Sequence, residues 1–305
     1  ISIVIVSWNV ADLLVKCLAS IYANTPAPYT IETIVVDSAS GDDTVERVHS
    51  EFPQVTMLAQ AENVGFTRGN NIGLKAARGR WLFLLNPDTE IHGDVITQLA
   101  DYLQAHPKVG IVGPRTLNSD GSDQATRRYF PSLLLEWMEG LWYSFHFSPL
   151  PPTHLPPDDP PADSTHPVEW LQGSALMAQR TLYDQIGGLD EGFFMFSEEV
   201  DWCKRAADAG WQIVYVGSGT ITHHGGRSTD QVATATLIRY YSSKVRYFRK
   251  HHGALQAALL RLYIEATYLG KMAIEGAKYL LGHKRDLRRE RLIQYRQLLR
   301  SGLAG

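Results

Sequence analysis

Three apolar segments of the sequence each end in polar side chains that could bind a nucleotide or a metal ion. The segments read IVIV, IVV and WLFLL, and the polar residues that follow them are Ser7 and Asn9, Asp37, and Asn86 with Asp88. A carboxylate after a buried strand can hydrogen-bond the nucleoside part of a nucleotide. A carboxylate that a proline turn holds beyond a strand, as at Asp88, can bind a divalent cation that bridges a diphosphate. Considered alone, each acid is explained equally well by a plain turn or a helix cap.

A second group of titratable residues lies near the start of an expected helix at 198–209. Glu198 and Glu199 could take part in proton transfer, but acidic residues in a first helical turn also complement the helix dipole without any catalytic role. Asp201 and Arg205 lie four residues apart. We therefore expect them to form a supporting ion pair on one face of the helix.

Two histidines, His223 and His224, follow an apolar run at 212–216 and precede two glycines. Neutral imidazole is a common metal ligand, and a histidine pair beside glycines is also common in ordinary loops. The residues alone leave both interpretations open.

The segments around these residues alternate between strand and helix patterns. Short apolar runs predict buried strands, and apolar residues spaced three and four apart predict helices. The predicted strands cover residues 2–7, 31–37, 55–59 and 81–85, and the predicted helices cover residues 12–23, 44–52 and 67–77. This alternation predicts an α/β fold with a mainly parallel sheet and helices on both faces. Because ligands of such sheets bind at the carboxyl ends of the strands, the polar residues there should share one site.

The composition is that of a globular protein of 305 residues, with 44% hydrophobic and 20% charged residues. These values exclude a largely disordered chain and a polytopic membrane protein. Two cysteines, Cys17 and Cys203, are too few for a zinc cluster or a disulfide framework, so we expect a reducing cytosolic compartment. The first residues form an apolar run with no basic region before it, and we expect no signal peptide.

We predict one domain over residues 1–253, interrupted by a mobile insertion, and a helical tail over residues 254–305. The insertion covers residues 148–167, which hold eight of the fifteen prolines, and we expect no regular structure there. A linker between two domains would also be rich in proline. Because α/β patterning resumes after the segment, an insertion is favoured.

The tail combines positive charge with apolar residues at helical spacing. It carries ten Lys and Arg against four Asp and Glu. Charged residues interrupt the apolar positions too often for a membrane-spanning helix, so we expect an amphipathic helix at a membrane surface. Packing on the protein's own body or in a homo-oligomer is the main alternative. We expect no nucleic-acid partner, because the tail lacks a strand platform with aromatic side chains.

Taken in order, the motifs of this sequence resemble those of the inverting family 2 glycosyltransferases with the GT-A fold. The resemblance is to the bacterial rhamnosyltransferase-like branch, whose members extend cell-surface polysaccharides, and it covers roughly residues 1–250. Each motif is weak alone, whereas the ordered set is specific. The motifs are IVIVSWN (3–9), VVDSASGDDT (35–44), NVGFTRGNNIG (63–73), LFLLNPDTEI (82–91), WLQGSALMAQRTLYDQIGGLDEGFFMFSEEVDWCKRAADAGW (170–211) and HHGGRS (223–228). The GT-A fold implies a single Rossmann-like, mainly parallel sheet flanked by helices, followed here by C-terminal amphipathic helices.

The resemblance implies roles for residues on the donor side. In the family, the positions of Ser7, Asn9 and Asp37 hold the nucleoside. The positions of Asn63 and Arg68 lie near the diphosphate.

The resemblance also implies a metal site at Asn86-Pro87-Asp88, which occupies the place of the family's DxD motif. Asp88 is the retained acid, and Asn86 replaces the first aspartate, which implies weaker metal binding that depends more on the nucleotide. Both residues would contact the nucleotide sugar. His223 matches the histidine that completes the metal or diphosphate site, and His224 is the weaker candidate. The implied cofactor is a divalent metal ion, Mg²⁺ or Mn²⁺.

Glu198 and Glu199 match the family's Glu-Asp pair, whose second member is the catalytic base. Glu199 therefore takes the role of the base, with a side chain one methylene longer than the usual aspartate, and Glu198 would lie on the acceptor side. Trp170 and Gly173 fall where the family packs the acceptor against the donor sugar. Because Glu199 lies at a helix N-terminus, we expect its pKa to be low.

The implied reaction is inverting, metal-dependent transfer of a sugar, with rhamnose favoured, from a nucleoside-diphosphate sugar to a hydroxyl of a glycan or lipid-linked glycan. The implied location is cytoplasmic and peripheral, at the inner face of the cell membrane. A nucleotidyltransferase also uses an α/β sheet and a bound metal, but no glycine-rich basic loop follows the first strand. A non-catalytic carbohydrate-binding subunit is a third interpretation, which the retained Asp88, Glu199 and His223 disfavour.

Overall fold

The computed structural model describes residues 1–24, 28–145, 160–225 and 233–303. Contacts between Cα atoms divide the chain into two compact units. Unit 1 consists of Ile1–Phe194 and Glu198–Ser228, and unit 2 consists of Met195–Ser197 and Thr229–Gly305.

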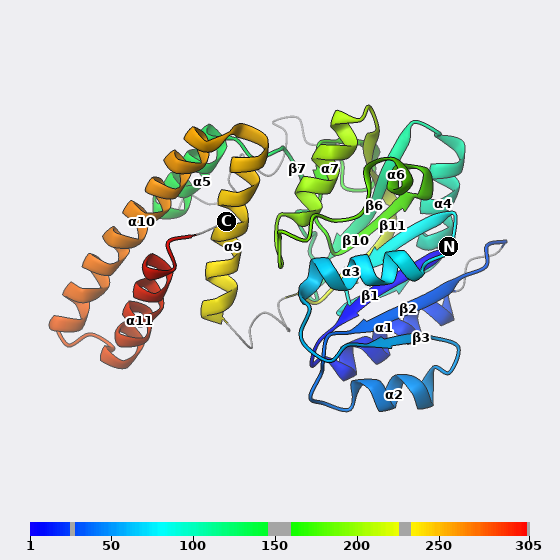
Figure 1. The fold of residues 1–305 in the computed structure, drawn as a ribbon, viewed down its shortest axis with the longest axis horizontal. Coiled ribbons are helices and arrows are strands. Elements are labelled where there is room, and N and C mark those ends of the chain that lie inside the picture. The colour runs from blue at the N-terminus through cyan, green and yellow to red at the C-terminus, as the bar shows by residue number, and fades with distance from the viewer. Residues whose placement is uncertain (25–27, 146–159, 226–232, 304–305) are drawn as a thin grey trace. The chain divides into compact units, whose positions relative to one another are not determined.

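A mixed sheet forms the centre of unit 1 (Figure 1). Its strands are β1 (Ser2–Ser7), β2 (Glu32–Asp37), β3 (Thr56–Ala59), β4 (Trp81–Leu85), β5 (Thr89–His92), β6 (Val109–Leu117), β8 (Thr165–Val168), β10 (Ala175–Gln179) and β11 (Gln212–His223). They lie in the order β3-β2-β1-β4-β10-β6-β11-β5, and β8 pairs with β11. Pairing is parallel from β3 to β4 and between β6 and β11, whereas β10, β5 and β8 run antiparallel to their neighbours. A small second sheet pairs β7 (Arg127–Arg128) with β9 (Trp170–Leu171).

Helices cover both faces of this sheet, which confirms the predicted fold class. The helices of unit 1 are α1 (Ala11–Ala23), α2 (Thr44–Glu51), α3 (Gly65–Ala76), α4 (Val95–Ala105), α5 (Leu133–Phe145), α6 (Arg180–Ile186) and α7 (Glu198–Asp208). Figure 1 shows α3 and α1 on opposite sides of β1. Ile3 and Ile5 pack into a core cluster with α1 and α4, whereas Val4 and Val6 face α3. Because both faces of β1 are buried, the strand is apolar at each of these positions.

The last part of the proline-rich segment differs from the sequence expectation. Residues 148–159 lie outside the described residues, but Thr165–Val168 forms β8, which pairs with β11 at an edge of the sheet. The Tyr215 hydroxyl also donates to the Ala162 carbonyl oxygen over 2.7 Å. The expectation that the whole segment lacks regular structure is therefore wrong. Pro167 is tolerated in β8 because an edge strand can lack a backbone N–H that a central strand needs.

A bulge interrupts β11 before its final residues. Pairing with β6 is regular from Ile213 to Val216 and resumes at Thr220, so residues 217–219 have no counterpart on β6. A Cβ on Gly217 would lie 2.5 Å from backbone atoms near residue 163, and one on Gly219 would lie 2.5 Å from a Val95 methyl group. These glycines let the bulge fit against its neighbours, and the end of β11 then pairs with β5.

Unit 2 contains α9 (Ala233–His252), α10 (Ala254–Leu280) and α11 (Arg285–Ser301), with α10 packed against the other two. The sequence analysis places a boundary after residue 253, where Gly253 has a φ of 87° and separates α9 from α10. The contacts group α9 with the tail, because α9 and α10 pack along each other and bring the rings of Tyr241 and Tyr268 within 5.5 Å. Within the part of the chain that the structure describes, no helix is both long and apolar enough to cross a membrane.

The close packing of α3 on β1 gives a stability prediction. A Cβ on Gly73 would lie 2.3 Å from a Val4 methyl carbon, so Gly73→Ala forces the two elements apart. We predict a loss of about 1–3 kcal/mol in the free energy of unfolding, measured by urea unfolding with tryptophan fluorescence. The matched control is Gly270→Ala on α10, where a Cβ meets nothing within 4 Å. That change should stabilise its helix by about 0.5–1 kcal/mol, and equal effects of the two changes would contradict the prediction.

Candidate active site

The carboxyl ends of β2, β1 and β4 lie side by side in the sheet. Ser7 pairs with Asp37 across β1 and β2, and Ile5 pairs with Leu85 across β1 and β4. Residues that follow these strands therefore emerge at one edge, as the sequence predicted. The backbone N–H of Ser38 donates to the Ser7 carbonyl oxygen over 2.8 Å and holds the first two strand ends together.

Two of the predicted nucleoside-binding residues are buried at this edge. The Asp37 carboxylate is 2% exposed; its Oδ2 accepts from the Ser40 backbone N–H over 3.0 Å. The other oxygen, Oδ1, is buried and has no hydrogen-bond partner among the described residues, and the same is true of the Ser7 hydroxyl. Since buried polar atoms are normally satisfied, these two groups have hydrogen-bonding capacity left for a ligand.

Asn9 and Asn63 shape the loops around that edge. Asn9 has a φ of 53° and its Oδ1 accepts from the Gly41 backbone N–H over 2.7 Å. The Asn63 Oδ1 accepts from the Gly65 N–H over 3.0 Å. Arg68 is exposed and lines, together with Asn63 and Glu62, a pocket of about 530 Å³. The structure thus places the predicted donor-side residues around the strand ends. Arg68 lies 3.9 Å from the Glu62 carboxylate in the pocket lining, and both side chains are exposed.

The predicted metal-binding residues meet where β4, β5 and β11 converge. His223 is the last residue of β11 and lies opposite Thr89 of β5. Its Nε2 lies 3.3 Å from Asp88 Oδ1 and 3.3 Å from Asn86 Nδ2. Asn86 and His223, which are 137 positions apart in the sequence, are thus brought into one group.

Gln124 positions the His223 ring, and the sequence analysis missed it. The Gln124 Oε1 lies 2.8 Å from His223 Nδ1, and the Gln124 amide Nε2 donates to Asn118 Oδ1 over 2.9 Å. With the amide held in this orientation, Nδ1 carries the proton and Nε2 presents a lone pair toward Asp88. A metal-ligating histidine is commonly held in this way by a hydrogen bond to its other nitrogen.

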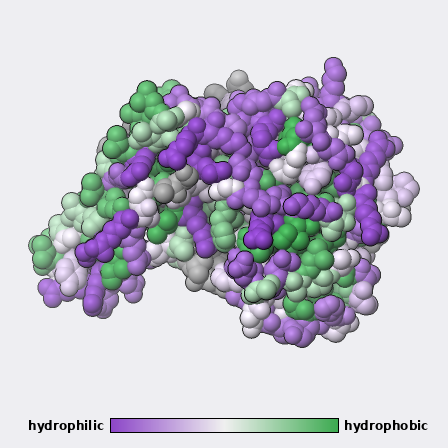
Figure 2. Space-filling view, in the orientation of Figure 1, coloured by the Kyte–Doolittle hydropathy of each residue, from purple (hydrophilic) through white to green (hydrophobic). Residues whose placement is uncertain are grey.

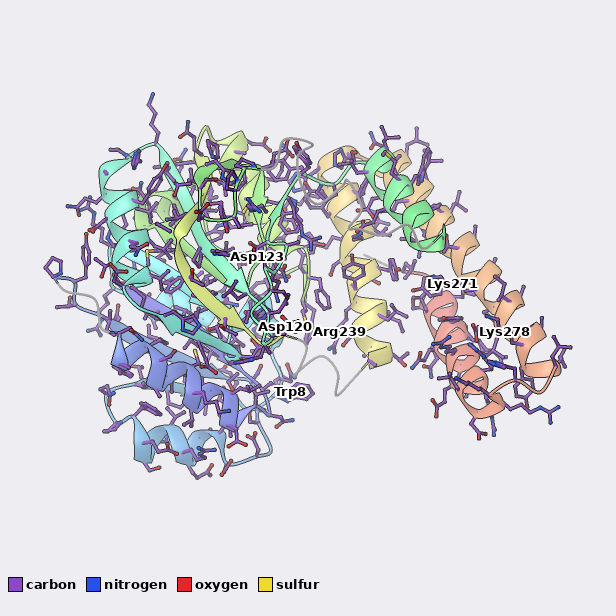
Figure 3. The ribbon with its side chains drawn as sticks, turned by 180° about the vertical axis from the view of Figure 1, so that it is seen from behind. Trp8, Asp120, Asp123, Arg239, Lys271 and Lys278 are labelled. Carbon is purple, nitrogen blue, oxygen red and sulfur yellow. The ribbon has the colours of Figure 1, made fainter. Side chains whose placement is uncertain are left out.

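The hairpin that carries Gln124 is itself tied down. The Arg115 guanidinium donates to both oxygens of Asp123, over 2.6 and 3.0 Å, and Figure 3 labels Asp123 beside the sheet. The Asn118 backbone N–H donates to the Ser122 carbonyl oxygen over 2.8 Å. These bonds hold Gln124 at the distance that His223 needs.

The residues of this group fit a divalent cation. The Asp88 oxygen and the His223 lone pair are two acceptors that face each other at 3.3 Å, and the Asn86 Oδ1 is a buried acceptor with no partner among the described residues. A cation held by Asp88 and His223 would give both of these acceptors a partner, whereas Asn86 faces His223 with its amide nitrogen, 3.3 Å away. No cluster of three or more His, Cys, Asp or Glu suited to a metal occurs in the described ranges, so phosphate oxygens or water would have to complete the coordination shell of such a cation.

His224, the weaker candidate of the two histidines, lies outside this group. Its Nε2 is 2.8 Å from Glu90 Oε1, and its Nδ1 is 2.7 Å from the Ser119 hydroxyl. Both ring nitrogens therefore have partners. The ring of His224 points away from that of His223, because successive residues of an extended chain point to opposite sides.

Glu198 and Glu199 begin α7 in different environments. Glu198 is 4% exposed, whereas Glu199 is half-buried, and one oxygen of each carboxyl group is buried without a partner among the described residues. Gly173 lies against Glu199, because a Cβ at Gly173 would be 3.4 Å from the Glu199 side chain. Of the two acids, Glu199 is the one that solvent or a substrate can reach.

The expected low pKa of Glu199 is wrong. Burial raises the pKa of Glu199 above its usual range, and backbone N–H groups and the positive charge of Arg128 oppose this shift. Burial and the neighbouring Glu199 raise the pKa of Glu198 still further. The helix N-terminus favours the charged form, but removal of the carboxyl groups from water has the larger effect.

Trp170 lies beside the same acids. Its indole N–H donates to the Tyr129 carbonyl oxygen over 2.7 Å, and the Arg128 guanidinium lies 5.5 Å from the centre of its ring system. The sequence analysis did not single out Arg128. Its guanidinium lies over the Trp170 ring, and its positive charge favours the ionised form of Glu199. The predicted ion pair behind these residues is confirmed, with Arg205 Nε 2.8 Å from Asp201 Oδ2.

A short link joins the metal-binding group to the acids. The Asn86 backbone N–H donates to the Ser174 carbonyl oxygen over 2.9 Å, and Ser174 follows Gly173, which touches Glu199. The cation ligands and the accessible carboxylate therefore lie on two sides of residues 173–174.

Comparison with known sequences shows which proteins this chain resembles. The sequence matches the description "Glycosyl transferase family 2" over residues 2–203, well over half of the chain. It is 29% identical over 301 residues to the N-acetylglucosaminyl-diphospho-decaprenol L-rhamnosyltransferase of Mycobacterium tuberculosis, a match that covers 95% of this chain and 96% of that protein. It is 24% identical over 201 residues to the rhamnosyltransferase WbbL of Escherichia coli K12, covering 61% of this chain and 70% of that protein.

Solved structures share the fold at low sequence identity. The mannosyltransferase PcManGT of Pyrobaculum calidifontis, in complex with GDP-Man and Mn²⁺, has a TM-score of 0.57 and 17% identity, with coverage of 99% of this chain and 85% of that one. GalNAc-T7 with UDP, GalNAc and Mn²⁺ has a TM-score of 0.58 and 14% identity, with coverage of 81% and 47%. Together with the match over residues 2–203, these likenesses mean that the chain belongs to glycosyl transferase family 2 and is a glycosyltransferase with the GT-A fold.

Proposed function

We propose that the protein transfers a sugar, with rhamnose favoured, from a nucleoside-diphosphate sugar to a hydroxyl group of a glycan or lipid-linked glycan, with inversion at the anomeric carbon. The observation that carries this proposal is the link through residues 173–174 between the Asp88–His223 pair and Glu199. The names of the two rhamnosyltransferase relatives support the choice of sugar. A role in cell-surface glycan synthesis follows from the same relatives.

On the donor side, Asp37 and Ser7 would bind the nucleoside with the polar atoms that lack partners in the fold. Arg68 would approach the diphosphate from the neighbouring pocket. A divalent cation, Mg²⁺ or Mn²⁺, would be held by Asp88 and His223, and it would neutralise the negative charge that develops on the leaving nucleoside diphosphate.

On the acceptor side, Glu199 serves as the base. The acceptor hydroxyl donates its proton to the Glu199 carboxylate while its oxygen attacks the anomeric carbon from the face opposite the diphosphate. The new C–O bond forms as the bond to the diphosphate breaks, so configuration inverts without a covalent glycosyl-enzyme. The raised pKa of Glu199 makes it a stronger base than an exposed glutamate. Trp170 is 8% exposed, so its part on the acceptor side would be to support the residues around Glu199.

The choice of base and ligands predicts two different kinds of defect. Glu199→Gln should reduce transfer by about 10²–10⁴-fold with little change in donor binding, because a base acts on the acceptor in the transition state. Asp88→Ala should weaken metal-dependent donor binding, because a ligand of the cation acts on the diphosphate in the ground state. Turnover measurements detect the defect of Glu199→Gln, and calorimetry of donor binding detects the defect of Asp88→Ala.

A panel of sugar nucleotides, with thymidine diphosphate rhamnose first and uridine diphosphate sugars next, tests the function itself. A glycosyltransferase releases free nucleoside diphosphate, a nucleotidyltransferase makes pyrophosphate, and a carbohydrate-binding subunit makes neither product. Near-normal turnover of Glu199→Gln would move the base to Glu198 or Asp201.

The electrostatics of Glu199 predict a pH effect. The base must be ionised, so kcat/KM should rise with pH through the raised pKa of Glu199. Arg128→Gln removes a positive charge that favours the carboxylate, and the acidic limb of the profile should move to higher pH. Arg128→Lys keeps the charge and should leave the limb closer to its original position. A limb that stays in place in both variants would mean that Arg128 does not act on Glu199.

The hydrogen bond from Gln124 predicts a selective effect on the metal. Gln124→Ala frees the His223 ring to change its tautomer, and the apparent affinity for Mn²⁺ with a bound nucleoside diphosphate should fall by about 10–100-fold. The affinity is measured by thermal shift, without turnover. Gln124→Glu keeps an acceptor toward Nδ1 and should retain more of the affinity than alanine. Equal Mn²⁺ affinity in wild type and Gln124→Ala would contradict the positioning role.

A further inference from the structure

The helix α10 is apolar on two opposite faces, and only one of them is packed within unit 2. Ala257, Leu260, Ile264 and Tyr268 are buried on the packed face. On the opposite face, leucines recur at intervals of three, four, seven and eleven residues. This leucine face consists of Leu255 (74% exposed), Leu259 (39%), Leu262 (61%), Leu269 (59%) and Leu280 (78%).

The leucine face is long and carries no charge. Exposed alanines at positions 258, 266 and 273 lie between the leucines, and the helix of 27 residues is about 40 Å long at 1.5 Å per residue. Figure 2 shows apolar side chains along this part of the molecule. Isolated exposed leucines are ordinary, but a continuous apolar strip of this length marks a surface that something covers.

The strip ends at a turn where cations gather. Leu281, in the turn between α10 and α11, is 85% exposed and adjoins Leu280. Lys284 and Arg285 are also exposed there. Lys278, which Figure 3 labels on α10, lies two positions from Leu280 and is paired with Glu275 of the packed face, 3.9 Å away. We call Leu280, Leu281, Lys284 and Arg285 the basic tip. Exposed leucines and exposed cations thus share one end of the helical hairpin.

The charge of unit 2 favours a lipid surface over the pairing of two copies through this unit. Residues 229–305 carry 15 Lys and Arg against 5 Asp and Glu. Two such units face to face would repel each other, because like charges brought together across an interface disfavour association. An anionic lipid surface attracts the same cations while its acyl region takes up the leucines.

We propose that the leucine face and the basic tip bind an anionic lipid surface. Leu280 and Leu281 enter the headgroup layer, the leucine face lies along it, and Lys284 and Arg285 contact lipid phosphates. This binding requires neither sugar donor nor acceptor, so it holds or fails independently of the proposed reaction.

Flotation of the full-length protein with vesicles tests the proposal. The protein should float with vesicles of phosphatidylcholine that contain phosphatidylglycerol and stay behind with phosphatidylcholine alone. High salt should release much of it, because screening weakens the attraction to the anionic headgroups.

Two sets of variants separate the apolar and the cationic contributions. Leu280→Ser with Leu281→Ser should reduce binding, whereas Leu134→Ser, at a leucine that is 65% exposed on α5, should not. Each cation at a lipid surface is worth about a fivefold change in affinity. Lys284→Glu and Arg285→Glu together should therefore lower affinity by on the order of 25-fold or more. Lys75→Glu and Lys108→Glu change the net charge equally at exposed positions of unit 1 and should have little effect.

Circular dichroism confirms that each variant is folded before the comparison. Binding by the tip variants equal to that of the wild type overturns the proposal. So does a wild-type protein that ignores anionic vesicles and sediments as a dimer that Leu262→Ser dissociates, in which case the leucine face is an interface between copies.

Discussion

The register of β4 determines how the two halves of the active site come together. Leu85 lies opposite Ile5 on parallel β1 and opposite Ala175 on antiparallel β10. The first pairing brings the residues after β4 next to the nucleoside edge. The second brings Asn86 into a hydrogen bond with Ser174, beside the accessible carboxylate. A slip of one residue would turn every side chain of β4 to the other face. Trp81 and Phe83 would then have to fit into the space that leucines fill, and the close packing of both faces disfavours that exchange.

The part of the chain that contains the proposed donor site carries a net negative charge, so binding of an anionic donor must depend on groups close to that site. Residues 1–228 carry 14 Lys and Arg against 27 Asp and Glu. An acidic unit repels a nucleoside diphosphate at long range, so attraction must come from close groups such as the pocket that contains Arg68 and a cation held by Asp88 and His223.

Local patterns predicted most of what positions the site, and long-range contacts account for the rest. Residues 81–85 form β4 as predicted, because a strand buried on both faces leaves an unbroken apolar run. The pKa of Glu199 could not be predicted, since burial depends on neighbours that are distant in sequence. Gln124 lies in a polar hairpin without any periodic signal, and its partner His223 is 99 positions away. The strand at Thr165–Val168 was hidden because proline content says nothing about whether a strand lies at an edge.

The bulge in β11 constrains how the protein can change over evolution. Residues 217–219 insert an odd number of positions before the strand pairs again, and the two histidines that follow point to opposite sides. If the strand after the bulge shifted with it, loss of one residue would bring His224 to the position beside Asp88, and gain of one residue would bring Thr222 there. In either case Gln124 would no longer hold the ring of His223. Insertions and deletions in this bulge should therefore be disfavoured, whereas substitutions there are limited mainly by the space around Gly217 and Gly219.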